Sequence, residues 1–226
     1  MSDRKRRSDL GRDGRKDGSP VDSFETSLAE SVAHHGHLCP GQVLGVRLAM
    51  AGCRAVGVDE PRESRDLIVY VEIDRCATDA IQTITGCKLG KRTLKHVDYG
   101  KMAATFCNVR TGQAVRVVAR DDSRAKARAY ASPEATMHEA QLRAYRLMSD
   151  VELFDIAFVR VHIRPSDLPG HPTSRVACEQ CGEGVNDGRE VKSKGRVLCR
   201  ACAFQPYYEL VDPSSIDHRP VEAARR

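Results

Sequence analysis

The chain has 226 residues, 41% of them apolar, which is enough for one substantial domain and a small module. Its net charge of +5 is concentrated in residues 1–20, where seven lysines and arginines accompany four aspartates, and we expect a disordered basic tail there. No run approaches the roughly 18 apolar residues of a membrane span, and the tail lacks the apolar segment of a signal peptide. We therefore expect a cytoplasmic protein without a membrane partner.

Hydrophobic spacing predicts an α+β domain over residues 21–164. The expected elements of its first half are a helix capped by Asp22 or Ser23, a helix over 40–56, a central strand over 67–73 and a short helix over 78–84. Those of its second half are strands over 103–110 and 114–120, a helix from Asp121, a helix over 133–148 capped by Ser132, and a strand over 154–163. The Thr111-Gly112 dipeptide between two strands predicts a hairpin, so the sheet should be largely antiparallel.

The segment His34-His35-Gly36-His37-Leu38-Cys39-Pro40-Gly41 places imidazoles and a thiol in one loop. We expect His34 to end the preceding helix, Cys39 to occupy an N-cap and Pro40 the first helical position. The positive end of the helix dipole then favours the Cys39 thiolate, and a thiolate flanked by imidazoles suits zinc. The alternative is a His-rich surface turn with a capping cysteine.

Cys76 and Cys87 bracket the short helix that follows the central strand, and we expect this helix to face the His loop. The candidate ligands of this first metal site are His35, His37, Cys39, Cys76 and Cys87. Asp74 or Asp79 could orient an imidazole, and Cys39, Cys87 and Asp79 are the candidate catalytic residues. Cys53 and Cys107 are expected in the core.

The chain has nine cysteines, an odd number that argues against a disulfide framework. Four of them form two Cys-x-x-Cys pairs with the spacing of a structural zinc site: Cys178, Cys181, Cys199 and Cys202. Four thiolates close the shell, so this centre should be structural; an iron centre with the same ligands is the alternative. We expect a linker over residues 165–177, a zinc-ribbon-like module over 178–205 and a C-terminal tail over 206–226.

Four ordered motifs carry a family resemblance: residues 35–41, 75–82, 85–94 and 98–101. With them, the chain resembles the FmdE family, named for one of the subunits of formylmethanofuran dehydrogenase, and the cysteine pairs resemble the zinc module that many members carry. Lys88 departs from the small polar residue expected there. The resemblance implies an α+β metal-binding domain, often a homodimer, with His37, Cys39, Cys76 and Cys87 near the site, and a molybdenum or tungsten oxidoreductase as partner.

The sequence supports a zinc-binding accessory or subunit protein of such a one-carbon oxidoreductase, rather than an enzyme acting alone. Two alternatives stay open: a stand-alone zinc enzyme that uses metal-bound water, and a thiol redox switch in which Cys39 pairs with Cys76 or Cys87. Nucleic-acid binding is not favoured, because residues 178–202 hold five basic and four acidic residues.

Overall fold

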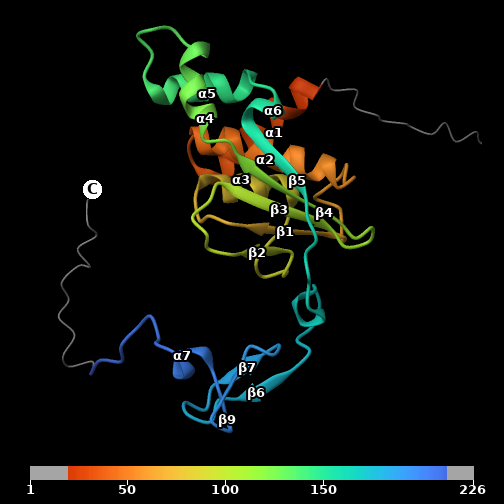
Figure 1. Cartoon of the computed structure of the whole chain (residues 1–226), viewed down its shortest axis with the longest axis vertical. Helices are drawn as coiled ribbons and strands as arrows, with labels where there is room; N and C mark the ends of the chain where they lie inside the picture. The colour runs from red at the N-terminus through yellow and green to blue at the C-terminus, as the bar shows by residue number, and fades with distance from the viewer. Residues whose placement is uncertain (1–19, 213–226) are drawn as a thin grey trace, which may run out of the picture. The chain divides into compact units, whose positions relative to one another are not determined.

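A computed structural model describes residues 20–212 of the chain (Figure 1). The expected basic tail lies outside the described residues except for Pro20, and so does the end of the C-terminal tail, residues 213–226. The described residues form two compact units, one ending at His162 and the other beginning at Ile163. Among these residues, no helix has the length and apolar character needed to cross a membrane.

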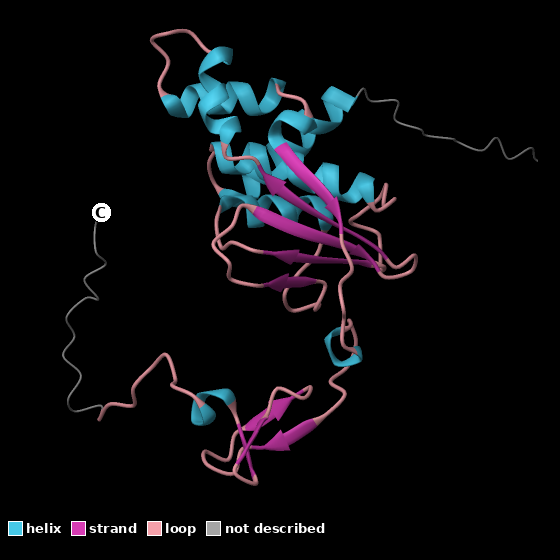
Figure 2. Ribbon diagram, viewed as in Figure 1, coloured by secondary structure: helices cyan, strands magenta, loops and turns pink. Residues whose placement is uncertain are grey.

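The first unit is an α+β domain, as the sequence predicts (Figure 2). Its helices are α1 (Pro20–His35), α2 (Pro40–Ala55), α3 (Cys76–Thr85), α4 (Asp122–Lys126), the 3-10 helix η1 (Ala127–Tyr130), α5 (Met137–Leu147) and α6 (Asp150–Leu153). Its strands are β1 (Leu67–Val71), β2 (Leu94–His96), β3 (Ala103–Asn108), β4 (Gln113–Ala119) and β5 (Phe154–Phe158).

The five strands form one sheet in the order β2-β1-β3-β4-β5. Strand β1 was expected at the centre of the sheet; it is an interior strand, paired on both sides, and β3 is the central one. The β3–β4 hairpin turns at Thr111-Gly112, where Gly112 has a φ of +75°. Three pairings are antiparallel and one, β1 with β2, is parallel. The carboxyl ends of β1 and β2 therefore lie together at the edge where α3 begins.

Helices lie over one face of the sheet (Figure 2), and two glycines of α2 allow close packing there. A Cβ on Gly45 would lie 2.7 Å from the Cα of Ala77 in α3, and one on Gly52 would lie 2.2 Å from the ring of Phe106 in β3. Both approaches require the absence of a side chain. Gly45 and Gly52, two turns apart on one face of α2, thus seat this helix against α3 and β3, which fixes where its first turn meets that of α3.

Several predicted boundaries were wrong. Helix α1 begins at Pro20, before the expected caps. Proline is tolerated in the first turn because the backbone N–H that it lacks would have no hydrogen-bond partner within the helix. Helix α5 begins at Met137, not at Pro133, because Thr136 and Glu139 form a capping box that satisfies two amide donors. Strand β5 ends at Phe158, and the short strand β2 was not predicted.

The second unit contains the 3-10 helix η2 (Pro165–Asp167), two hairpins and a short helix. The hairpins are β6 (Arg175–Ala177) with β7 (Gly184–Asn186), and β8 (Val191–Ser193) with β9 (Arg196–Leu198); the helix is α7 (Arg200–Ala203). Among its described residues only Cys178, Asp187 and Leu198 are buried. An apolar core of this size cannot stabilise the unit without a cross-link such as a bound metal ion.

Candidate metal centres

The His loop joins the end of α1 to the start of α2. Helix α1 ends at His35, one residue after the expected end at His34, and Gly36 has a φ of +96°. Cys39 is the extended N-cap of α2 with Pro40 in the first turn, as the sequence predicts. This tight connection brings a ring nitrogen of His35, a ring nitrogen of His37 and the Cys39 sulfur within 4.8 Å of one another. Three donors at this spacing can bind one ion.

Asp79 on α3 contacts His35. Its Oδ2 lies 2.8 Å from the Nδ1 of His35, while the Nε2 of the same ring is buried and has no hydrogen-bond partner among the described residues. A buried polar atom without a partner costs free energy, and native structures rarely leave one. The unpartnered Nε2 is thus a candidate metal ligand. Because the contact to Nδ1 comes from Asp79, this residue and not Asp74 is the carboxylate that holds an imidazole of the His loop.

Cys76 lies beside Cys39 in the first turn of α3, although its sulfur is not within 4.8 Å of all three donors of the His loop. Its thiol is within hydrogen-bonding reach of Cys39, and a Cβ on Gly41 would lie 3.7 Å from the Cys39 sulfur and 3.8 Å from the Cys76 sulfur. Burial, and then the adjacent Cys39 thiol, raise the pKa of the Cys76 thiol. Two neighbouring thiols resist ionising together, and a divalent cation between them removes that conflict.

A buried polar network links α1, α2 and the backbone of Cys76. Gln42 is fully buried; it accepts a hydrogen bond from Ser31 of α1 and donates one of 2.6 Å to the carbonyl oxygen of Cys76. Gln42 and Gly45 were not singled out from the sequence, where only the small residues at the start of α2 indicate close packing.

Cys87 does not join the group. It lies beyond the far end of α3, a helix of ten residues and so roughly 15 Å long. Its thiol is buried against the carbonyl oxygen of Leu67, and burial raises its pKa. Cys53 is its buried neighbour, with a pKa raised to about 12 by burial and then by Cys87. These thiols, and that of Cys107, pack in the interior.

An open pocket of about 490 Å³ borders this centre at the carboxyl ends of β1 and β2. His35, Cys76 and Asp79 form one side, and Val71, Ile73, Leu89 and Leu94 supply apolar walls. Four further polar side chains line it without a partner among the described residues: Asp74, Arg75, Gln82 and His96. Such a pocket, apolar with a few polar groups, is typical of small-molecule sites. His96 reaches it from the strand that was not predicted.

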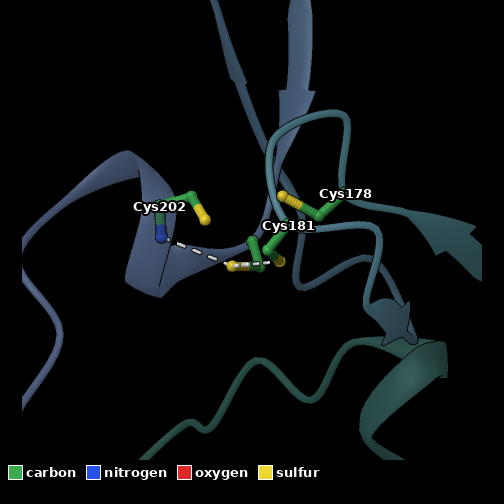
Figure 3. A group of neighbouring side chains, drawn as sticks. Cys178, Cys181 and Cys202 are labelled. Carbon is green, nitrogen blue, oxygen red and sulfur yellow. Dashed lines mark hydrogen bonds between the residues drawn. The ribbon is translucent and has the colours of Figure 1, made fainter. Parts of the chain in front are cut away.

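The second unit gathers Cys178, Cys181, Cys199 and Cys202, whose sulfurs lie within 4.8 Å of one another. Figure 3 shows the sulfurs of Cys178, Cys181 and Cys202 directed toward a common centre. The Cys181 and Cys199 sulfurs are 3.9 Å apart, close to the roughly 3.8 Å expected between thiolates on one tetrahedral zinc ion. Gly182, with a φ of +77°, permits the turn after the first pair.

The pKa values of these neighbouring thiols differ, because each thiol affects the ionisation of the others. Amide groups of Cys181 and Cys199 lower the pKa of Cys178 to about 6, whereas the Cys199 thiol and burial raise the pKa of Cys202 to about 12. A dication stabilises all four thiolates together, and this donor set fits zinc.

The comparisons with known proteins agree with this fold and with the four-cysteine centre. The family model described as "FmdE, Molybdenum formylmethanofuran dehydrogenase operon" matches residues 34–155, and that of the prokaryotic dksA/traR C4-type zinc finger matches residues 172–208. The chain belongs to the FmdE family and carries a C4-type zinc finger at its C-terminal end, which supports structural zinc there.

Two individual proteins are similar. A tungsten formylmethanofuran dehydrogenase FmdE-like protein from Syntrophus aciditrophicus shares the fold, with a TM-score of 0.53 and 22% identity over 82% of this chain and 95% of that one. A probable S-adenosyl-L-methionine-binding protein from Archaeoglobus fulgidus is 32% identical over 87% of this chain. The chain spans 57% of that relative's length.

Proposed function

We propose that the first unit binds a transition metal ion, zinc by the chemistry of its donors, through His35, His37, Cys39 and Cys76. The observation that carries this proposal is the buried, unpartnered Nε2 of His35 in a ring whose other nitrogen contacts Asp79. Two imidazoles and two thiolates are a common zinc shell. Bound there, zinc would act as a Lewis acid toward any group that replaces the exposed His37.

The chain's own residues would perform the remaining work. Cys39 is the N-cap of α2 and Cys76 the first residue of α3, so both thiols stand at helix N-terminal ends next to each other. Gln42 fixes the position of the Cys76 backbone. The largely buried ring of His35 keeps water away from its side of the metal centre. These features suit a metal-binding accessory or subunit protein, which we propose serves a molybdenum- or tungsten-dependent one-carbon oxidoreductase.

Zinc content per chain tests the metal centre. We expect two zinc ions in the full chain, one in Cys39→Ala and one in Cys76→Ala, measured by elemental analysis of purified protein. Cys107→Ala is the matched control, because Cys107 is a buried thiol of β3, and it should retain two. A single zinc ion in the unsubstituted chain would overturn the proposal.

The accessory role needs a separate experiment. When a tagged chain is produced with the molybdenum or tungsten pterin subunits of a formylmethanofuran dehydrogenase-like enzyme, we expect it to co-purify with them and Cys39→Ala to reduce their activity. Enzyme that purifies apart from the chain, with the same activity in its absence, would contradict the role.

Binding of S-adenosyl-L-methionine in the pocket beside Cys76 is a second candidate function. The name of the Archaeoglobus fulgidus relative suggests this ligand, and the pocket favours it with apolar walls for a ring and the unpartnered Asp74 and Arg75 for a charged amino-acid group. Isothermal titration of the ligand into the full chain should give heat that Gln82→Ala reduces and Gln113→Ala, an exposed control, does not. Absence of binding would exclude this candidate.

We also propose that the chain forms a homodimer. Strand β5 lies at the edge of the described sheet and exposes Ile156 and Phe158, the latter 75% exposed. Exposed apolar residues on a sheet edge commonly mark a place where another strand pairs. Light scattering after size exclusion should give the mass of a dimer, and Phe158→Lys should shift it toward the monomer; a monomer without substitution would contradict this.

A further inference from the structure

We propose that Asp79 is a positioning residue of the His-loop centre: it holds His35 in the tautomer that presents Nε2 to the metal ion. This inference rests on the proposed function and goes beyond it, because it assigns a role to a residue that is not itself a ligand.

The contact determines where the proton of the ring lies. An ionised carboxylate only accepts hydrogen bonds, so the 2.8 Å contact between Oδ2 and Nδ1 requires a proton on Nδ1. A neutral ring then has a bare lone pair on Nε2, the buried atom without a partner among the described residues. That lone pair is the form of imidazole that binds a metal ion.

The two side chains are held by different helices whose contact is fixed. His35 ends α1, and Asp79 stands in the first turn of α3, where Thr83 donates a 2.8 Å hydrogen bond to its carbonyl oxygen. Helix α3 is in turn seated on α2 by the contact of Gly45 with Ala77. The carboxylate is therefore in place before any ion arrives, which is the requirement for orienting a ligand.

Asp74 provides the comparison within the chain. It is also a carboxylate that borders the same pocket, yet it is exposed and has no hydrogen bond or ion pair with another described residue. If general negative charge near the centre were what matters, the two residues would be equivalent. If the Nδ1 contact matters, only Asp79 affects the centre.

The test measures metal affinity of the full chain for cobalt(II) in chelator competition, comparing Asp79→Ala with Asp74→Ala. Cobalt reports on each centre separately, since its charge-transfer absorption differs between four thiolates and two thiolates with two imidazoles. We expect Asp79→Ala to weaken the His-loop centre by about 10- to 100-fold and to leave the four-cysteine centre unchanged. Asp74→Ala should leave both unchanged.

A second readout separates positioning from a merely structural role. In the metal-free chain, nitrogen-15 chemical shifts of His35 should show a proton on Nδ1, and Asp79→Ala should give a mixture of tautomers while α1 and α3 stay folded. Equal affinities in the Asp79→Ala and Asp74→Ala variants, with two ions still bound, would overturn the role of Asp79 and leave the metal centre standing. An unsubstituted chain that binds one ion would instead refute the centre itself.

Discussion

The buried amide of Gln42 donates a 2.6 Å hydrogen bond to the carbonyl oxygen of Cys76, so a residue in the first turn of α2 fixes the first residue of α3. The same side chain accepts a hydrogen bond from Ser31 in α1. One glutamine thus connects the three helices whose ends supply the donors of the His-loop centre.

Gln42→Ala should therefore destabilise the first unit and weaken its metal centre together. The substitution leaves the Ser31 hydroxyl and the Cys76 carbonyl without their buried partner, at a cost of about 1–3 kcal/mol for each group. Chemical denaturation and cobalt titration measure the two effects. Gln141→Ala, which removes a half-buried glutamine bonded to the Tyr145 hydroxyl, should leave the metal affinity unchanged; an equal loss in both variants would contradict the role of Gln42.

Gly45→Ala should destabilise the first unit by about 1–3 kcal/mol, because the added methyl group meets the backbone of Ala77 at 2.7 Å and pushes α2 and α3 apart. The free energy of unfolding in urea measures this. Gly90→Ala is the control: a Cβ there meets nothing within 4 Å, and we expect a change within about 0.5 kcal/mol. Similar stability of the two variants would show that the helix contact is looser than described.

Removal of zinc should unfold the second unit and spare the first. The second unit has only three buried side chains among its described residues, so ligation must supply most of its folding free energy. Proton NMR before and after a strong chelator should show collapse of the signals of β6 to β9, whereas those of β1 to β5 persist. Cys202→Ala should reproduce this without chelator. Retention of the β6–β9 signals in zinc-free protein would refute a structural centre.

Glu152 should make the stability of the first unit depend on pH at acid values. Hydrogen bonds from the hydroxyl and amide of Ser149, and then from Tyr130, lower the pKa of this carboxyl from its ordinary value of 4.5 to about 2. The folded-state pKa is depressed, so the stabilisation is fully present above pH 4.5 and is lost as the pH falls to about 2.

Thermal unfolding from pH 7 to 2 should show the Tm difference between the unsubstituted chain and Glu152→Gln shrinking below pH 4.5. Glu134→Gln removes an exposed glutamate that has no ion pair with a described residue, and its Tm difference should stay constant. A constant difference for Glu152→Gln would mean that the Ser149 contacts do not persist in solution.

Local signals in the sequence predicted much of the fold and part of the site. The apolar run of β1, the turn at Gly112 and the Cys39-Pro40 helix start are each decided by neighbouring residues, and the structure agrees with them. The start of α5 could have been predicted, since Thr136 and Glu139 have the spacing of a capping box. Pro133 is a competing start signal that the helix does not use.

The remaining features depend on contacts between distant segments. Strand β2 has three residues and exists because it pairs in parallel with β1, which no local pattern reveals. Cys76 and Cys87 look equivalent in sequence, but the length of α3 separates them, and only Cys76 meets Cys39. The choice of Asp79 over Asp74 likewise required the position of α3 relative to the end of α1.

X-ray absorption at the zinc edge of the zinc-loaded full chain would show whether the His loop holds a second zinc ion. One centre has four cysteines, and the other would add two cysteines and two histidines. We expect an average of about three sulfur and one nitrogen neighbours per zinc, with sulfur at roughly 2.3 Å and nitrogen at roughly 2.0–2.1 Å. A shell of four sulfurs alone, with one zinc per chain, would contradict this expectation and leave the His loop without a metal.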